Sequence, residues 1–153
     1  MTAIVIVVMA AVSIPVIAPR YRDYQMRSAA WQIAGDLRLA RQRAVTTRNT
    51  YRFTFIAQGD PAPNPSTYNT YVIEYLPPQG AVWVQETPPV AGTRKALAGP
   101  VRIDPTSSPA SPTRRIQFAS NGSVVPTGTV RIVGPGGVTL SIVVDQVGRV
   151  QVN

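Results

Sequence analysis

The first 49 residues of the chain decide its fold. Residues 1–19 read MTAIVIVVMAAVSIPVIAP, and residues 20–49 read RYRDYQMRSAAWQIAGDLRLARQRAVTTRN. The first stretch carries no charged side chain, and as a helix it would be about 28 Å long, close to the hydrocarbon thickness of a bilayer. The second stretch is rich in arginine. Because the two are contiguous, the sequence predicts one long N-terminal helix, apolar in its first part and amphipathic in its second.

The amphipathic part has a regular apolar stripe. Its members recur at steps of three and four, the period of a helix with one buried face. They are Met26, Ala30, Ile33, Leu37, Ala40 and Ala44, flanked by Ala29, Ala34 and Val45. Small side chains dominate this stripe, so the helix can lie close against a sheet. On a neighbouring face fall Arg27, Arg38, Arg41 and Arg48, and Asn49 is a candidate helix stop.

After residue 49 the apolar period changes from helical to two. Tyr51, Phe53 and Phe55 alternate with more polar neighbours, which predicts a strand whose aromatic face packs on the helix. Further strands are expected at 71–76, 81–85, 101–103, 115–119, 128–133, 138–144 and 147–152. The second and third should form a hairpin, and short connections predict a meander of the last four. A helix followed by strands predicts an α+β fold, with the long N-terminal helix packed on an antiparallel β-sheet head.

The apolar opening admits three interpretations. A cleaved secretory signal would need positive charge before the apolar run, and a buried globular helix would more often carry a polar stripe. A membrane or assembly helix at 1–19 fits best, with residues 20–153 as the head that it carries. Pro15 should kink or loosen this helix because it removes one backbone donor. The arginines that follow residue 19 conflict with a simple anchor, because the positive-inside tendency would put the head in the cytoplasm unless positive residues are missing upstream.

The composition argues against an enzyme. The 153 residues include no cysteine and no histidine, and the seven carboxylates lie at least 12 residues apart, so the sequence predicts no cofactor, no metal site and no small-molecule substrate. The glycine-rich segment 134–137 joins two expected strands without a following helix, which favours a turn over a phosphate-binding loop. Lys95, the only lysine, lies in an expected loop.

The charge is concentrated in the helix. The net charge is +8, of which residues 20–52 carry +6 and residues 53–153 carry +2. A basic total is compatible with nucleic acid or anionic lipid as a partner. The candidates for direct DNA contact are Arg114, Arg115, Arg131 and Arg149, the last two on strands that could be neighbours. Scattered solvated charges are the alternative. Trp31 and Trp83 could each seal the boundary between helix and sheet.

Three segments together resemble the type IV pilin-like superfamily, and more closely its minor-pseudopilin branch, often called GspH/FimT. The first is the apolar run that ends at Ile14-Pro15. The second is AGDLRLARQRAVTTRNTYRFTF at 34–55, which is similar to the helix end and first strand of that branch. The third is the ending that combines RIQFASNGSV at 115–124, GTVRIV at 128–133 and LSIVVDQVGRVQV at 140–152.

The resemblance implies a structural role. Such a protein is held in the bacterial inner membrane by one span, with its head in the periplasm. It then packs its helix among other pilins or pseudopilins of a type II secretion pseudopilus or type IV pilus, at or near the tip. The residues implied in membrane insertion and assembly are Met1, Ala3, Ile4, Ile6, Val7, Ala10, Ala11, Ile14 and Pro15.

The resemblance also bears on the charge conflict and on DNA. Prepilins begin with a basic leader and an FTLIE-like start, neither of which is present, so we expect the sequence to begin about six or seven residues inside the mature protein. A FimT-like variant of the branch binds DNA and is associated with a Gly-Arg-x-Arg tail. Here Gln151 stands at the second arginine position after Gly148-Arg149-Val150, which weakens this alternative. A cytoplasmic anchored regulator is a third possibility, with no recognition-helix pattern to support it.

Overall fold

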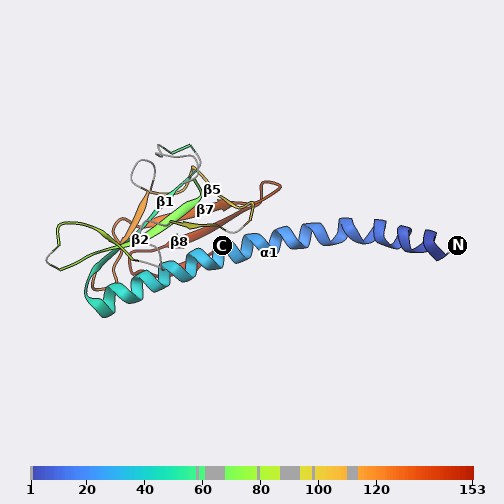
Figure 1. The fold of residues 1–153 in the computed structure, drawn as a ribbon. Helices are drawn as coiled ribbons and strands as arrows, with labels where there is room; N and C mark the ends of the chain where they lie inside the picture. The colour runs from blue at the N-terminus through green and yellow to red at the C-terminus, as the bar shows by residue number, and fades with distance from the viewer. Residues whose placement is uncertain are drawn as a thin grey trace.

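The structure is a computed structural model that describes residues 2–57, 59–60, 68–78, 80–86, 94–97, 99–109 and 114–153, with the backbone alone for 2–20. Its main element is one helix, α1 (Thr2–Thr47). The C-terminal half of α1 lies along the head, and the N-terminal half projects from it as a rod (Figure 1). The expected long N-terminal helix is therefore confirmed, although the side chains of its apolar part lie outside the described residues.

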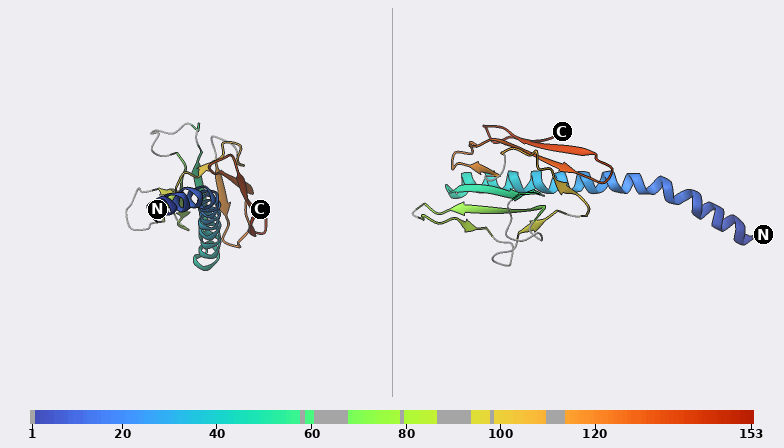
Figure 2. Two further views of the ribbon diagram at one scale, coloured as in Figure 1. Left: turned by 90° about the vertical axis from the view of Figure 1, so that its right-hand side faces the viewer. Right: turned by 90° about the horizontal axis from the view of Figure 1, so that it is seen from above.

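Two local expectations about α1 need adjustment. The helix continues without a break through Pro15, and the rod curves along its length (Figure 2). The helix ends at Thr47, two residues before Asn49, because Arg48 adopts the left-handed backbone conformation with φ 56°. Within the described residues, no helix has the combination of length and apolar character that crossing a membrane requires.

The first sheet is built around β1 (Thr50–Ile56). β1 pairs antiparallel with β2 (Thr70–Leu76) on one side and with β6 (Arg115–Phe118) on the other, so that Phe53 lies between Ile73 and Ile116. The outer edge of β2 carries two short strands, β3 (Val84–Gln85) and β4 (Lys95–Ala96). The predicted β2–β3 hairpin is confirmed, with a shorter second strand.

The second sheet has the order β5-β7-β8-β9. Its strands are β5 (Arg102–Ile103), β7 (Gly128–Val133), β8 (Thr139–Val144) and β9 (Val150–Val152), all paired antiparallel. The expected edge strand at 101–103 is confirmed. Residues 134–137 form the β7–β8 turn, with Gly136 at φ 88° and Gly137 at φ 78°.

The predicted four-stranded meander at the C-terminus is wrong in one strand. β6 belongs to the first sheet, and only β7, β8 and β9 form a meander. The connection from Phe118 to Gly128 is much longer than a tight hairpin loop, and it carries the chain from one sheet to the other. Val124 is buried within it and bridges to Phe118. Sequence order alone therefore assigned β6 to the wrong neighbour.

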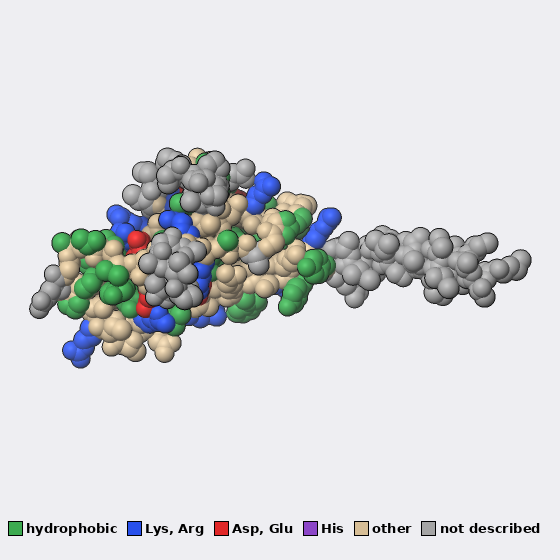
Figure 3. All heavy atoms as spheres, in the orientation of Figure 1, with side chains coloured by type: hydrophobic (Ala, Val, Ile, Leu, Met, Phe, Trp, Pro, Cys, Tyr) green, Lys and Arg blue, Asp and Glu red, His purple; other side chains and the backbone are tan. Residues whose placement is uncertain are grey.

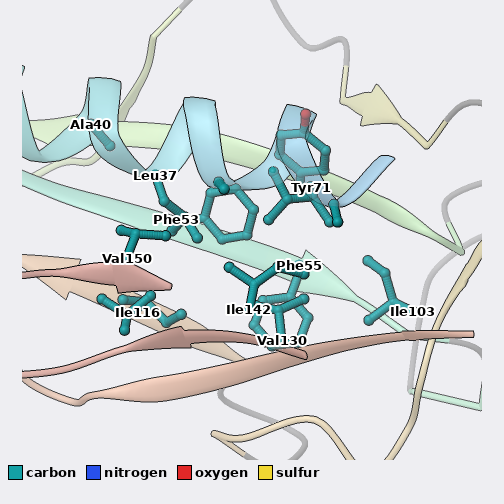
Figure 4. Packing of buried hydrophobic residues seen from close by; sticks show 14 of the residues in the cluster. Leu37, Ala40, Phe53, Phe55, Tyr71, Ile103, Ile116, Val130, Ile142 and Val150 are labelled. Atoms are coloured by element: carbon teal, nitrogen blue, oxygen red, sulfur yellow. The ribbon is translucent and has the colours of Figure 1, made fainter. Parts of the chain in front are cut away.

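α1 lies along one side of the head (Figure 1) and contacts both sheets, through β1 and β6 of the first and β7, β8 and β9 of the second. The small residues of the predicted stripe form the contact. The three alanines of the stripe and the two that flank it are fully buried, namely Ala29, Ala30, Ala34, Ala40 and Ala44. The third flanking residue, Val45, is exposed instead. Figure 4 shows Leu37 and Ala40 of α1 facing the aromatic residues of β1 and β2, with Val130 and Ile142 of the second sheet nearby. The prediction that Tyr51, Phe53 and Phe55 face the core is confirmed.

Candidate functional site

The candidate functional site is α1 itself, whose two halves differ in their surroundings. From Met26 onward the helix is held in the head by its buried stripe, whereas the first half projects beyond both sheets (Figure 1). The predicted assembly residues between Ala3 and Pro15 belong to this projecting rod. Met1 and the side chains of 2–20 lie outside the described residues, so the assignment of 1–19 as a membrane or assembly segment stays a prediction.

A polar network fastens one side of α1 to the first sheet. The Tyr71 hydroxyl donates to Asp36 Oδ2 at 2.6 Å and accepts a hydrogen bond from Gln32 Nε2 at 2.9 Å. Lys95 Nζ of β4 donates to both oxygens of Asp36 at 2.8 and 2.9 Å. Burial, the hydrogen bond to Asp36 and the charge of that carboxylate raise the pKa of Tyr71 far above its usual value. The network therefore joins α1, β2 and β4 near the middle of the head.

The C-terminal turns of α1 form further polar contacts with the rest of the head on two of their sides. Arg43 forms an ion pair with Glu86, and Glu86 also accepts a hydrogen bond from the Tyr51 hydroxyl at 3.3 Å. On the opposite side, Arg38 Nη2 donates to the Val150 carbonyl at 3.2 Å, and Arg41 Nε donates to the Gly122 carbonyl at 3.4 Å. Because residues of both sheets contact the same helix, the second half of α1 is an integral part of the head.

The predicted DNA-contact residues are not brought together. Arg114 is buried, with Nε 2.5 Å from Asp60 Oδ2 in an ion pair that lacks hydrogen-bond geometry, while its two terminal nitrogens donate to the Ser107 and Pro105 carbonyls. Arg115 is exposed on β6 of the first sheet. The guanidinium of Arg114 is therefore enclosed by the protein and is not presented to a ligand.

The strands at Arg131 and Arg149, which the sequence suggested could be neighbours, are not adjacent. Arg131 lies on β7 and Arg149 directly precedes β9, and β8 separates the two strands because consecutive hairpins place each strand beside the next. Arg149 Nε lies 3.1 Å from Asp145 Oδ2. Hydrogen bonds from Arg149, first of all from its backbone N–H, lower the pKa of Asp145. DNA contact by these residues stays a prediction without a common surface.

The two tryptophans differ from expectation in part. Trp31 is 57% exposed on the outer face of α1, so it does not seal the boundary between helix and sheet. The Arg38 guanidinium lies 5.7 Å from its ring centroid. Trp83 is half-buried and lies against Arg52, with the guanidinium carbon 4.1 Å from the ring centroid.

One hollow formed by the described residues lies on the second sheet. A groove of about 610 Å³ runs along the start of β7 and the end of β8, and its lining includes Ser108, Thr129 and Asp145. Its carboxylate is the one already bonded to Arg149. Among the described residues no three carboxylate, histidine or cysteine side chains are placed to hold a metal ion.

The comparisons with known proteins identify the family. The model of the family described as type II transport protein GspH matches residues 29–148, most of the chain. The chain belongs to the GspH family. The helix packed on antiparallel sheets in this GspH-family protein is a pilin-like α+β fold.

Two solved structures illustrate the shared fold. The minor pseudopilin EpsH from the type 2 secretion system of Vibrio cholerae superposes with a TM-score of 0.63 at 13% identity, covering 84% of this chain and 96% of that one. The type IV minor pilin FimU of Pseudomonas aeruginosa gives a TM-score of 0.59 at 18% identity, covering 86% and 90%. A search of curated protein sequences finds no match. At these identities the likeness concerns the fold.

Some residues that shape this site escaped the sequence interpretation. The arginine face of α1 was visible as a pattern, but nothing in it indicated that Arg38 and Arg41 bond to carbonyls of the second sheet. The Asp36–Lys95 pair joins residues 59 positions apart, and no local pattern signals such a contact.

Proposed function

We propose that this protein is a structural minor subunit that assembles through the rod half of α1 into a pilin-type filament. The filament is the pseudopilus of a type II secretion system or a type IV pilus, and the subunit lies at or near its tip. The observation that carries the proposal is the unbroken α1, of which one half is buried in the head and the other projects beyond it. A projecting helix with the apolar sequence of 1–19 is unfavourable in water, so it must be covered by lipid or by other helices.

The two covers correspond to two stages. Before assembly the rod spans the inner membrane, with the head in the periplasm. On assembly it exchanges lipid for the rods of neighbouring subunits. Helix association of this kind depends on close packing, and small residues of the rod such as Ala3, Ala10 and Ala11 permit it. The role requires no catalysis, cofactor or small-molecule substrate.

The absence of cysteine from the chain makes the rod directly testable by site-specific cross-linking. A single cysteine introduced as Ala10→Cys, labelled with a benzophenone maleimide in cells and irradiated, should give adducts with other pilin-like subunits. The matched control is Gln151→Cys on the exposed edge strand β9. With the adduct yield of each variant divided by its labelled fraction, the control should give few such adducts. Equal adduct yields from the two positions would count against assembly through the rod.

A second experiment distinguishes the two machines. Ala11→Arg places a charge in the rod and should abolish function in cells that lack the native copy, because an unpaired charge is costly among apolar helices. Loss of extracellular enzyme secretion would assign the protein to a secretion pseudopilus, and loss of surface pili would assign it to a pilus. If neither is lost, the proposal fails. Antibody labelling of isolated filaments at their ends alone, not along their length, would support a tip position.

A further inference from the structure

A depression lies on the outer face of the last turns of α1. It has a volume of about 300 Å³ and is lined by Arg38, Arg41, Gln42, Val45 and Thr46. Val45 is 47% exposed although it is an aliphatic side chain. The surface continues along the helix to Trp31, itself 57% exposed, which underlies the Arg38 guanidinium. These residues recur at steps of three, four and seven, so they form one stripe along α1 and present apolar and cationic groups together.

The two arginines of the depression have no carboxylate partner among the described residues. Each donates to one backbone carbonyl at a long distance, 3.2 Å for Arg38 and 3.4 Å for Arg41, which leaves further N–H groups of each guanidinium available. Five of the seven carboxylates of the chain are already in ion pairs elsewhere. The stripe therefore presents uncompensated positive charge beside exposed apolar surface.

The position of the depression argues against a membrane as its partner. Arg41 lies 22 residues beyond the end of the apolar run, roughly 33 Å along the helix at 1.5 Å per residue. That distance exceeds about three Debye lengths at physiological salt, so anionic headgroups around the rod would be out of reach. The depression instead lies on the last turns of α1, and these turns are at the end of the head opposite the rod (Figure 1).

We propose that this stripe, from Trp31 to Val45, is the docking site for an acidic amphipathic helix of a different pilin-like subunit. The inference rests on the proposed filament role and specifies the chemistry of the neighbour. Carboxylates of the partner pair with Arg38 and Arg41, and its apolar side chains cover Val45 and Trp31. A second copy of this chain does not fit, because it would bring the same arginine-rich helix and a net charge of +8 to the contact.

The test places the photoreactive probe in the depression itself. Val45→Cys labelled with benzophenone maleimide in cells should cross-link to one other pilin-like subunit. Mass spectrometry should map the adduct to a helical segment rich in aspartate and glutamate. In the same background, the reversal Arg38→Glu with Arg41→Glu should lower the adduct yield at least tenfold, because like charges then face each other.

Matched variants separate charge from folding. Arg22→Glu with Arg27→Glu makes the same change in net charge on exposed positions of α1 outside the depression, and it should leave the yield within about twofold. Arg38→Lys with Arg41→Lys keeps the charge and should retain most of the adduct. Gln42→Glu adds one negative charge in the depression, where the Gln42 side chain is exposed, and should lower the yield about threefold or more. Circular-dichroism melting of each purified variant identifies any that unfolds, and Gln42→Glu then serves in place of the double reversal.

The outcomes distinguish this inference from the filament role. Adducts from Ala10→Cys but none from Val45→Cys would overturn the docking site and leave the filament role intact. Adducts from neither position would overturn both. A Val45→Cys adduct with a second copy of this chain, with DNA, or with a subunit surface that lacks carboxylates would also overturn the inference, as would an adduct that the double reversal leaves unchanged.

Discussion

Arg114 illustrates how residue identity misleads when burial is unknown. It was a candidate for DNA contact because it is adjacent to Arg115, yet its side chain is 6% exposed and is enclosed by Asp60 and the carbonyls of 105 and 107. Since a buried charge is tolerated only when it is paired, the contact with Asp60 is a requirement of the fold. No sequence pattern connects these residues, which are 54 positions apart.

Removing the charge of Asp60 should therefore be strongly destabilising. Asp60→Asn leaves the Arg114 guanidinium buried and uncompensated, and we expect the free energy of unfolding to fall by about 3–5 kcal/mol. Urea denaturation followed by circular dichroism measures the loss. Asp145→Asn breaks the exposed pair with Arg149 and should cost much less. Equal losses for the two variants would contradict the structural role of Arg114.

At the scale of elements, the contact between α1 and the sheets depends on small side chains. Ala40 is fully buried where the helix meets the sheets, whereas Gly35 lies on the outer face, where an added Cβ would meet no atom within 4 Å. Ala40→Leu should lower the free energy of unfolding by about 1–3 kcal/mol through overpacking. Gly35→Ala should raise it by about 0.5–1 kcal/mol, because alanine loses less conformational entropy in a helix. The melting temperatures should therefore shift in opposite directions, and a shift of the same sign would contradict the packing.

The network between α1 and β2 should make stability sensitive to alkaline pH. The pKa of Tyr71 is raised in the folded state above its unfolded value of 10.0, so the folded state holds the proton more tightly. Its contribution to stability is complete below about pH 10 and is lost as the pH rises above that value. Urea titrations between pH 8 and 11 should show a steeper fall in unfolding free energy for the native chain than for Tyr71→Phe.

Two features make this comparison selective. At pH 7 the variant should be less stable by about 1 kcal/mol, since the Asp36 and Gln32 bonds to the hydroxyl are gone. Tyr24→Phe removes the same hydroxyl at a position that is 70% exposed and outside the network, and it serves as the control for the substitution itself. If Tyr71→Phe followed the native pH dependence, Tyr71 would not be the titrating group.

At the scale of the whole molecule, the four arginines predicted to contact DNA are not gathered on one pair of neighbouring strands in the described part of the head. On the face seen in Figure 3, Lys and Arg side chains outnumber Asp and Glu but are dispersed among other residues. The four predicted contact arginines include one that is buried in an ion pair and one that is in an exposed ion pair. The full chain in detergent should therefore bind duplex DNA only weakly and non-specifically, with a Kd of about 10⁻⁴–10⁻⁶ M at physiological salt.

Electrophoretic mobility shift at two salt concentrations measures this affinity. Arg149→Ala should change it by less than about twofold, and the exposed Arg115→Ala should behave alike. Submicromolar binding that Arg149→Ala abolishes would establish the DNA alternative instead.

Local sequence patterns predicted most of the helices and strands, but fewer of the pairings between strands. The stripe from Met26 to Ala44 and the aromatic alternation of β1 report burial directly, so both faces were correct. The partner of β6 and the separation of Arg131 from Arg149 depend on where the chain changes sheets, a long-range choice that residues 119–127 do not reveal by period. The α1 contacts of Lys95, Val150 and Gly122 are equally non-local.

The uninterrupted passage of α1 from rod to head has a mechanical consequence. Any force that draws the rod along a filament axis is transmitted through a single covalent helix to the interior of the head, without a hinge at which it could dissipate. Strands of both sheets run roughly along α1 (Figure 2), so such a force acts in shear. A shear force acts on the contacts of Asp36, Arg38, Arg41 and Arg43 at the same time, so they would have to break together. The head should resist extraction better than its thermal stability alone suggests.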